Sequence, residues 1–156
     1  MESLKSLKDL QNWIKEVFQD PLAKILIEKS NLTKTQLETF LIDVITDYLT
    51  DKSIKIEDKA KIRIKGEISK GAFNRTLNQA RKNILSSIYT LILLGYLGLI
   101  DLTTITKYIE ASEKLKEYME LVKTRREREE AVEEARRELE EIFRELSEPK
   151  KIKYSM

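Results

Sequence analysis

The stretch that decides the fold is SKGAFNRTLNQARKNILSSIYTL, residues 69–91. Its apolar residues recur every three or four positions, which is the period of an amphipathic helix. Ser69 is a residue type that caps helix N-termini. The apolar face of this predicted helix holds Phe73, Leu77, Ala80, Ile84, Ile88 and Leu91. At about 100° per residue, the opposite face holds Gly71, Arg75, Asn78, Gln79 and Lys82.

Upstream, the same periodicity predicts three further helices, over about residues 3–19, 22–29 and 33–49. Asp20 and Pro21 are a typical N-cap and first helical residue. Thr33 and Gln36 have the spacing of a capping box. The predicted buried stripe of the third helix comprises Leu37, Phe40, Leu41, Val44, Tyr48 and Leu49.

Residues 54–64 allow two interpretations, because isoleucines alternate there with lysine and arginine. The alternation is that of a short strand, whereas Ile56-Glu57-Asp58 before Ala60 favours a short helix. A lone strand has no pairing partner elsewhere in this sequence. The segment is therefore predicted to be helical, with Gly66 at positive φ after it.

An apolar run follows at residues 84–100 (ILSSIYTLILLGYLGLI). It is shorter than the about 20 apolar residues of a membrane-spanning helix and contains serine, threonine and glycine. We expect a central helix buried on all sides and no membrane association. Gly95 and Gly98 either let another helix approach closely or mark the end of this helix near Gly98.

The C-terminal third has heptad-like spacing, first over Ile105–Val122 and again over Val132–Leu146. Ten residues replace seven between Val122 and Val132, which indicates either an overwound coiled coil or a bend between two helices. No glycine or proline stands there, so one continuous helix is favoured. The predicted organisation is all-α: a helical core (1–102) with a helix-turn-helix-like segment (54–88), a long dimerising helix (103–148) and a basic tail (149–156).

Composition excludes several kinds of site. The 156 residues contain no cysteine and no histidine, which excludes disulfides, zinc ribbons and histidine-based triads. No base accompanies Tyr89 or Tyr96 as a nucleophile. We therefore expect no enzymatic activity, no metal and no cofactor. Abundant lysine, glutamate and isoleucine are typical of heat-adapted proteins, and a cytoplasmic location is expected because the N-terminus does not resemble a signal.

The net charge of +2 conceals strong segregation. Residues 52–83 carry ten basic and three acidic residues, net +7, while residues 1–51 carry net −3 and residues 84–149 net −5. No acid occurs between Ile68 and Ile100. A concentrated positive field is typical of phosphate-binding surfaces, and arginine, asparagine and glutamine are the side chains that contact base edges. The predicted nucleic-acid-binding residues are Lys59, Lys61, Arg63, Lys65, Lys70, Asn74, Arg75, Asn78, Gln79, Arg81 and Lys82.

The segment EISKGAFNRTLNQARKNI, residues 67–84, resembles the turn and recognition helix of helix-turn-helix DNA-binding regulators. It looks most similar to small helical archaeal DNA-binding proteins. This resemblance implies a transcriptional regulator or chromatin-type protein that binds double-stranded DNA as a homodimer. The alternatives are an RNA or ribonucleoprotein-binding protein, and a structural subunit of a filament, capsid or larger particle.

Overall fold

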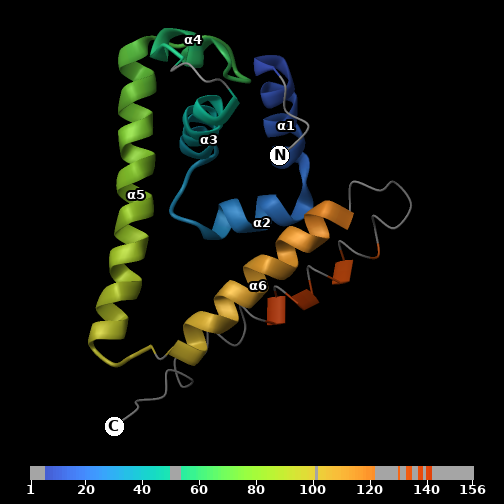
Figure 1. The fold of residues 1–156 in the computed structure, drawn as a ribbon, viewed down its shortest axis with the longest axis vertical. Helices are drawn as coiled ribbons and strands as arrows, with labels where there is room; N and C mark the ends of the chain where they lie inside the picture. Colours follow the sequence, from blue (N-terminus) through green and yellow to red (C-terminus); the bar gives the residue numbers. More distant parts are fainter. Residues whose placement is uncertain are drawn as a thin grey trace. The chain divides into compact units, whose positions relative to one another are not determined.

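The computed structural model describes residues 6–49, 54–100 and 102–121, together with residues 130, 133, 134, 137, 138, 140 and 141. These residues form helices and connections, and no strand occurs among them, so the all-α prediction is confirmed (Figure 1). The predicted basic tail, residues 149–156, lies outside the described residues. The helices are α1 (Leu7–Gln19), α2 (Pro21–Lys29), α3 (Lys34–Leu49), α4 (Ile56–Lys61), α5 (Lys70–Tyr96) and α6 (Leu102–Leu121).

The helix starts follow from local hydrogen bonds that the sequence predicted. The Asp20 carboxylate accepts a bond from the backbone N–H of Ala23 at 2.8 Å, at the start of α2. Thr33 and Gln36 form a reciprocal capping box, each backbone N–H donating to the other's side chain, at 3.0 and 3.2 Å. Ser69 caps α5 by accepting from the N–H of Ala72 at 3.2 Å. Each motif joins residues three positions apart, so it forms wherever the local spacing is right.

The end of α5 is formed by a glycine at positive φ. Gly98, at φ 68°, follows the end of α5. The N–H of Leu99 donates to the carbonyl of Leu94 at 2.9 Å, and the N–H of Gly98 donates to that of Gly95 at 3.0 Å. This pair of bonds is a Schellman motif, and the predicted helix end near Gly98 is confirmed.

Packing divides the chain into two units, Met1–Ser87 and Ile88–Met156, with the division inside α5. The boundary predicted from the sequence lies after residue 102 instead. In the first unit, α1 packs against α2 and α3, and α3 packs against α4 (Figure 1). The core of this unit comprises Leu10, Ile14, Ile42, Ile45, Ala60, Ile62, Phe73 and Leu77.

The predicted buried stripe of α3 is wrong at Tyr48 and is only partly buried elsewhere, although Phe40 and Leu41 pack against the core. Tyr48 is 80% exposed, and Leu37, Phe40, Leu41 and Val44 are only half-buried. The face that α3 buries instead comprises Gln36, Glu38, Thr39, Ile42, Asp43, Ile45 and Thr46. Most of these residues are polar, and their burial is possible because each finds a hydrogen-bond partner inside the fold.

The segment after α3 is helical as predicted, but it is not a tight helix-turn-helix. α4 is six residues long, from Ile56 to Lys61. The connection to α5, residues 62–69, is about twice as long as the three or four residues of a typical helix-turn-helix turn. Gly66 has φ 103°, as predicted, but it lies within this connection and not at the end of α4.

The second half of α5 is exposed, contrary to the prediction that it is buried on all sides. Ile88 and Leu91, assigned to the apolar face, are 47% and 46% exposed. The predicted apolar face of α5 is buried in the core only as far as Ala80. No helix in the described part of the chain is both long enough and apolar enough to span a membrane.

The C-terminal heptads do not belong to one continuous helix. The Nζ atom of Lys114 on α6 lies 3.7 Å from Oε1 of Glu138. A continuous helix from residue 114 to residue 138 would hold these residues about 36 Å apart. The chain therefore reverses between them, and the described helical residues after 129 lie beside α6 (Figure 1). The ten-residue interruption itself, between Val122 and Val132, lies almost entirely outside the described residues.

Candidate nucleic-acid interface

The first half of α5 presents one buried face and one exposed face. Phe73 and Ala80 are fully buried and Leu77 is 4% exposed. On the opposite side, four predicted binding residues and Gly71 are exposed, which confirms the predicted division of the helix; the four are Arg75, Asn78, Gln79 and Lys82. Asn74 is half-buried at the edge between the two faces.

Asn83 helps to hold this face in place. Its Nδ2 donates to the carbonyl of Asn31 at 2.8 Å and to Oε1 of Gln36 at 3.3 Å. One turn later, Ser87 accepts a bond from Nδ2 of Asn31 at 3.0 Å. Together with the buried Phe73, these bonds fix the rotation of α5 about its axis, and hence the direction in which its exposed face points.

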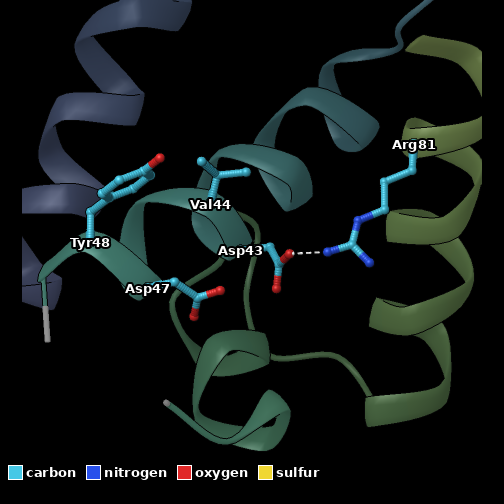
Figure 2. A pocket seen from close by; sticks show the side chains of 5 residues that line it. All are labelled: Asp43, Val44, Asp47, Tyr48 and Arg81. Atoms are coloured by element: carbon cyan, nitrogen blue, oxygen red, sulfur yellow. Dashed lines mark hydrogen bonds and ion pairs between the residues drawn. The ribbon is translucent and has the colours of Figure 1, made fainter. Parts of the chain in front are cut away.

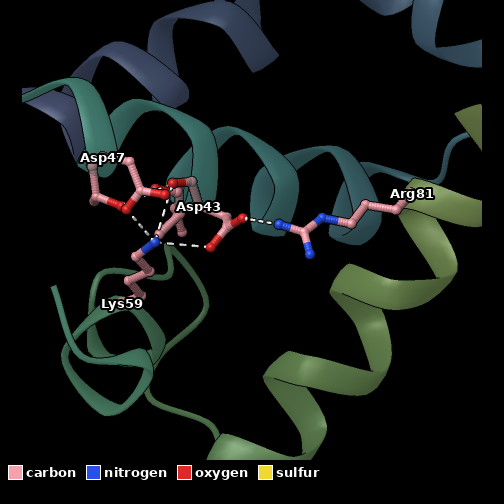
Figure 3. A network of polar contacts seen from close by, with 6 residues as sticks. Asp43, Asp47, Lys59 and Arg81 are labelled. Atoms are coloured by element: carbon pink, nitrogen blue, oxygen red, sulfur yellow. Dashed lines mark hydrogen bonds and ion pairs between the residues drawn. The ribbon is translucent and has the colours of Figure 1, made fainter. Parts of the chain in front are cut away.

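Lys59 does not lie on a surface. Its side chain is 5% exposed, and its Nζ donates to Oδ1 of Asp43 at 2.9 Å, Oδ1 of Asp47 at 2.7 Å and the backbone carbonyl of Asp43 at 3.2 Å (Figure 3). The second Asp43 oxygen accepts from Nη2 of Arg81 at 2.7 Å. Asp43 therefore links α3 to both α4 and α5 through opposite charges.

Arg63 is buried in a second ion pair. Its Nη2 and Nε donate to Oε2 of Glu38 at 2.9 and 3.3 Å, and both side chains are under 10% exposed. The other Glu38 oxygen accepts the backbone N–H of Ile64. In addition, Nε2 of Gln11 donates to the carbonyls of Ile62 and Arg63 at 2.9 and 3.3 Å. The pair thus fastens the connection before α5 to α3, and Gln11 fastens it to α1.

The predicted binding surface is corrected accordingly. Lys59 and Arg63 cannot reach phosphates, because both are buried against carboxylates of α3. Three further predicted residues are exposed but have carboxylate partners, namely Lys61 with Asp58, Lys70 with Glu57 and Arg81 with Asp43. Among the described residues no carboxylate pairs with the exposed Lys65, Arg75 or Lys82, nor with the exposed Lys55.

The sequence reasoning missed the two buried carboxylates, Glu38 and Asp43. The charge segregation in the sequence pointed to them, because the first 51 residues carry net −3 and the next 32 carry net +7. We interpreted that segregation as a field directed at an external partner. Part of it is internal, since α3 supplies acids and the α4 region supplies the matching cations.

An open pocket of about 280 Å³ lies beside this network, lined by Asp43, Val44, Asp47, Tyr48 and Arg81 (Figure 2). Asp43 and Asp47 already accept bonds from Lys59 and Arg81. Within the described ranges, no group of three or more acids has the arrangement to hold a metal ion. We assign no ligand to this pocket.

Burial opposes the charged form of Lys59, but the hydrogen bonds that its ammonium group donates to Asp43 and Asp47 outweigh this effect, so the pKa of this lysine is raised above its ordinary value of 10.5. A raised pKa stabilises the fold fully below the unfolded-state pKa, and this contribution is lost as the pH rises through the folded-state pKa. We expect the free energy of unfolding to fall above about pH 10.5 through this group.

Urea denaturation at about pH 9 and pH 11.5 measures this loss. The control is Lys59→Arg, since arginine stays charged at both pH values. The variant should lose less stability between the two pH values than the wild type, whatever its absolute stability. Equal losses would show that Lys59 does not cause the alkaline destabilisation.

The chain matches no protein-family model, no curated protein and no solved structure at a significant level.

Proposed function

We propose that this protein is a non-enzymatic nucleic-acid-binding protein, and that its ligand is double-stranded DNA. The observation that carries the proposal is the exposed face of α5 with Arg75, Asn78, Gln79 and Lys82. The face combines two cations with two amides, and α5 contains no acid along its 27 residues. A merely solvated helix gains from charges of both signs, so this composition favours an anionic partner.

Each side chain on this face has a counterpart on duplex DNA. Arginine forms bidentate bonds to guanine and the amides form them to adenine, while lysine contacts phosphates. Lys65 is a further exposed cation without a carboxylate partner among the described residues, and Lys61 and Lys70 can exchange their exposed acidic partners for phosphates. A regulator or chromatin-type protein acting as a homodimer fits this chemistry. Structured RNA is the competing ligand.

The affinity for duplex should fall steeply with salt. Each phosphate contact contributes a slope of about −0.9 to log affinity against log salt. Four exposed cations have no carboxylate partner among the described residues: Lys55, Lys65, Arg75 and Lys82. If all four contact phosphates, the slope is about −3.6, and the affinity falls roughly a hundredfold between 50 and 200 mM salt.

A mobility shift with duplex, single-stranded DNA and structured RNA at both salt concentrations tests this proposal. No shift of any of the three at the lower salt contradicts it. Stronger binding of RNA than of duplex assigns the surface to RNA instead.

Arg75→Ala separates base recognition from general attraction. The side chain is exposed, so its removal should barely change the melting temperature. If Arg75 contacts a base edge, the change should weaken binding to a preferred site by roughly 1–3 kcal/mol and relax discrimination there. Lys65→Ala removes an exposed cation that is expected to contact a phosphate. It should weaken binding to all DNA sequences about equally.

Lys15→Ala is the matched control, since Lys15 is exposed on α1 and outside the proposed face. It should bind like the wild type. Wild-type affinity for both Arg75→Ala and Gln79→Ala would leave the α5 face without a role in binding.

A further inference from the structure

The second half of α5 exposes an apolar face. Its side chains lie on one side of the helix, within an arc of about 140° at 100° per residue, and each is about half exposed or more. They are Leu85 (53%), Ile88 (47%), Tyr89 (67%), Ile92 (59%), Leu93 (54%) and Tyr96 (86%). We call these six residues the α5 seam.

The spacing within the α5 seam is that of a helix that packs against another helix. Its central residues, Leu85, Tyr89, Ile92 and Tyr96, follow one another by steps of four, three and four. This alternation is the heptad pattern of knobs-into-holes packing between two helices. The pattern therefore indicates a helical occupant.

The exposed area is that of a stable interface. At roughly 80–200 Å² per side chain, the α5 seam exposes about 700 Å², close to the about 800 Å² per partner of an ordinary specific complex. A monomer commonly leaves a smaller contiguous apolar patch in water. Two such faces together fall within the range of areas that specific protein–protein complexes bury.

The charge distribution is compatible with an identical partner. From Asn83 to Ile100 the sequence contains no charged residue, so two copies of this segment meet without repulsion. The polar residues interspersed in it are Ser86, Ser87 and Thr90. Pairing of two copies across this uncharged segment therefore requires no burial of an unpaired charge.

Helix α6, in which the predicted dimer contact begins, already has a neighbour in the same molecule. Lys114 on α6 contacts Glu138, so the described residues around Glu138 lie beside α6. We propose that the α5 seam binds the α5 seam of a second copy of this chain, and that this contact forms the homodimer.

The two helices run antiparallel in this dimer. The first half of α5 carries Lys70, Arg75, Arg81 and Lys82 and no acid. Parallel helices would bring these four cations beside their copies, whereas antiparallel helices keep the two sets at opposite ends. The symmetric register places Tyr89 of one copy opposite Ile92 of the other. This inference does not depend on the proposed binding of nucleic acid.

Sedimentation equilibrium of the full-length chain, with charges introduced into the α5 seam, tests the interface. The wild type should be dimeric at about 10 µM, and Tyr89→Lys and Ile92→Glu should each raise the dimer dissociation constant at least tenfold. Leu91→Glu is the matched control, because Leu91 lies on the same helix, is 46% exposed and points away from the seam. It should dimerise like the wild type.

The double variant Tyr89→Lys with Ile92→Glu tests the orientation. In the antiparallel dimer each new lysine faces a new glutamate, so the double variant should dimerise at least tenfold more tightly than either single variant. In a parallel dimer each new charge would face its own copy, and no recovery would occur. Failure to recover therefore overturns the antiparallel arrangement.

Three other results overturn the interface itself. A wild type that is monomeric at about 10 µM contradicts the self-association; if it also sediments with anionic lipid vesicles, the occupant of the seam is a membrane surface. Equal dimerisation of Ile92→Glu and Leu91→Glu contradicts the choice of face. Loss of helical circular dichroism in Ile92→Glu would mean that this side chain belongs to the core of a single chain.

Discussion

Replacing Lys59 by alanine is expected to lower the free energy of unfolding by about 3–5 kcal/mol, because removing one partner of a buried ion pair leaves the other charge uncompensated. The charge left behind is Asp43, whose side chain is 9% exposed. The Asp47 carboxylate is 54% exposed, so water can hydrate it once Lys59 is removed. This places the expected effect at the lower end of the range. Arg81 retains its bond to the second Asp43 oxygen, and this also moderates the loss.

The measurement is urea denaturation followed by circular dichroism near pH 7, with Lys61→Ala as the control. Lys61 is two residues away and pairs with Asp58, but both of these side chains are at least half exposed. Exposed pairs of this kind contribute at most about 1 kcal/mol, so Lys61→Ala should leave the unfolding midpoint almost unchanged. If Lys59→Ala unfolds at the same urea concentration as the wild type, Lys59 is not buried in solution. It would then again be a candidate nucleic-acid-binding residue.

Arg63→Ala is expected to cost a similar amount, about 3–5 kcal/mol. The change leaves Glu38, 3% exposed, without the guanidinium that donates hydrogen bonds to it and balances its negative charge. Ile64 would still donate its backbone N–H to Glu38, but one neutral donor does not replace a cation. The connection between α4 and α5 should loosen as a result, since Arg63 fastens it to α3.

A double variant distinguishes the pair from its individual charges. Arg63→Met with Glu38→Leu removes both charges and keeps apolar volume, which for buried pairs is often neutral or stabilising. We expect the double variant to be more stable than Arg63→Ala by at least about 2 kcal/mol. A double variant that is less stable than Arg63→Ala would mean that the Glu38 bond to Ile64 matters more than the Arg63 pair.

These two predictions bear on function as well as stability. Loss of nucleic-acid binding in Lys59→Ala or Arg63→Ala would follow from unfolding, because neither side chain reaches the surface. Loss of binding in Arg75→Ala, by contrast, should occur without a change in stability. Measuring both quantities for each variant therefore separates cations that support the fold from cations that contact a ligand.

The local features of this fold could be predicted from the sequence because they depend on residues three or four positions apart. The start of α2 at Asp20, the capping box of Thr33 and Gln36 and the cap at Ser69 were all predicted from spacing alone. The buried and exposed faces of the first half of α5 followed from the same periodicity. The end of α5 followed from Gly98, because few residues other than glycine adopt positive φ easily.

The tertiary structure alone decided which cations are available to a ligand. Lys59 and Asp43, and likewise Arg63 and Glu38, lie 16 and 25 positions apart in the sequence and meet only when α3 and the α4 region pack together. Periodicity could not reveal this pairing, because a polar residue on a helix is predicted to face water unless its partner is known. The same applies to α5 after Ala80 and to the reversal between Lys114 and Glu138. An apolar pattern shows that a face requires cover, but only the arrangement of the other elements determines whether the same chain supplies it.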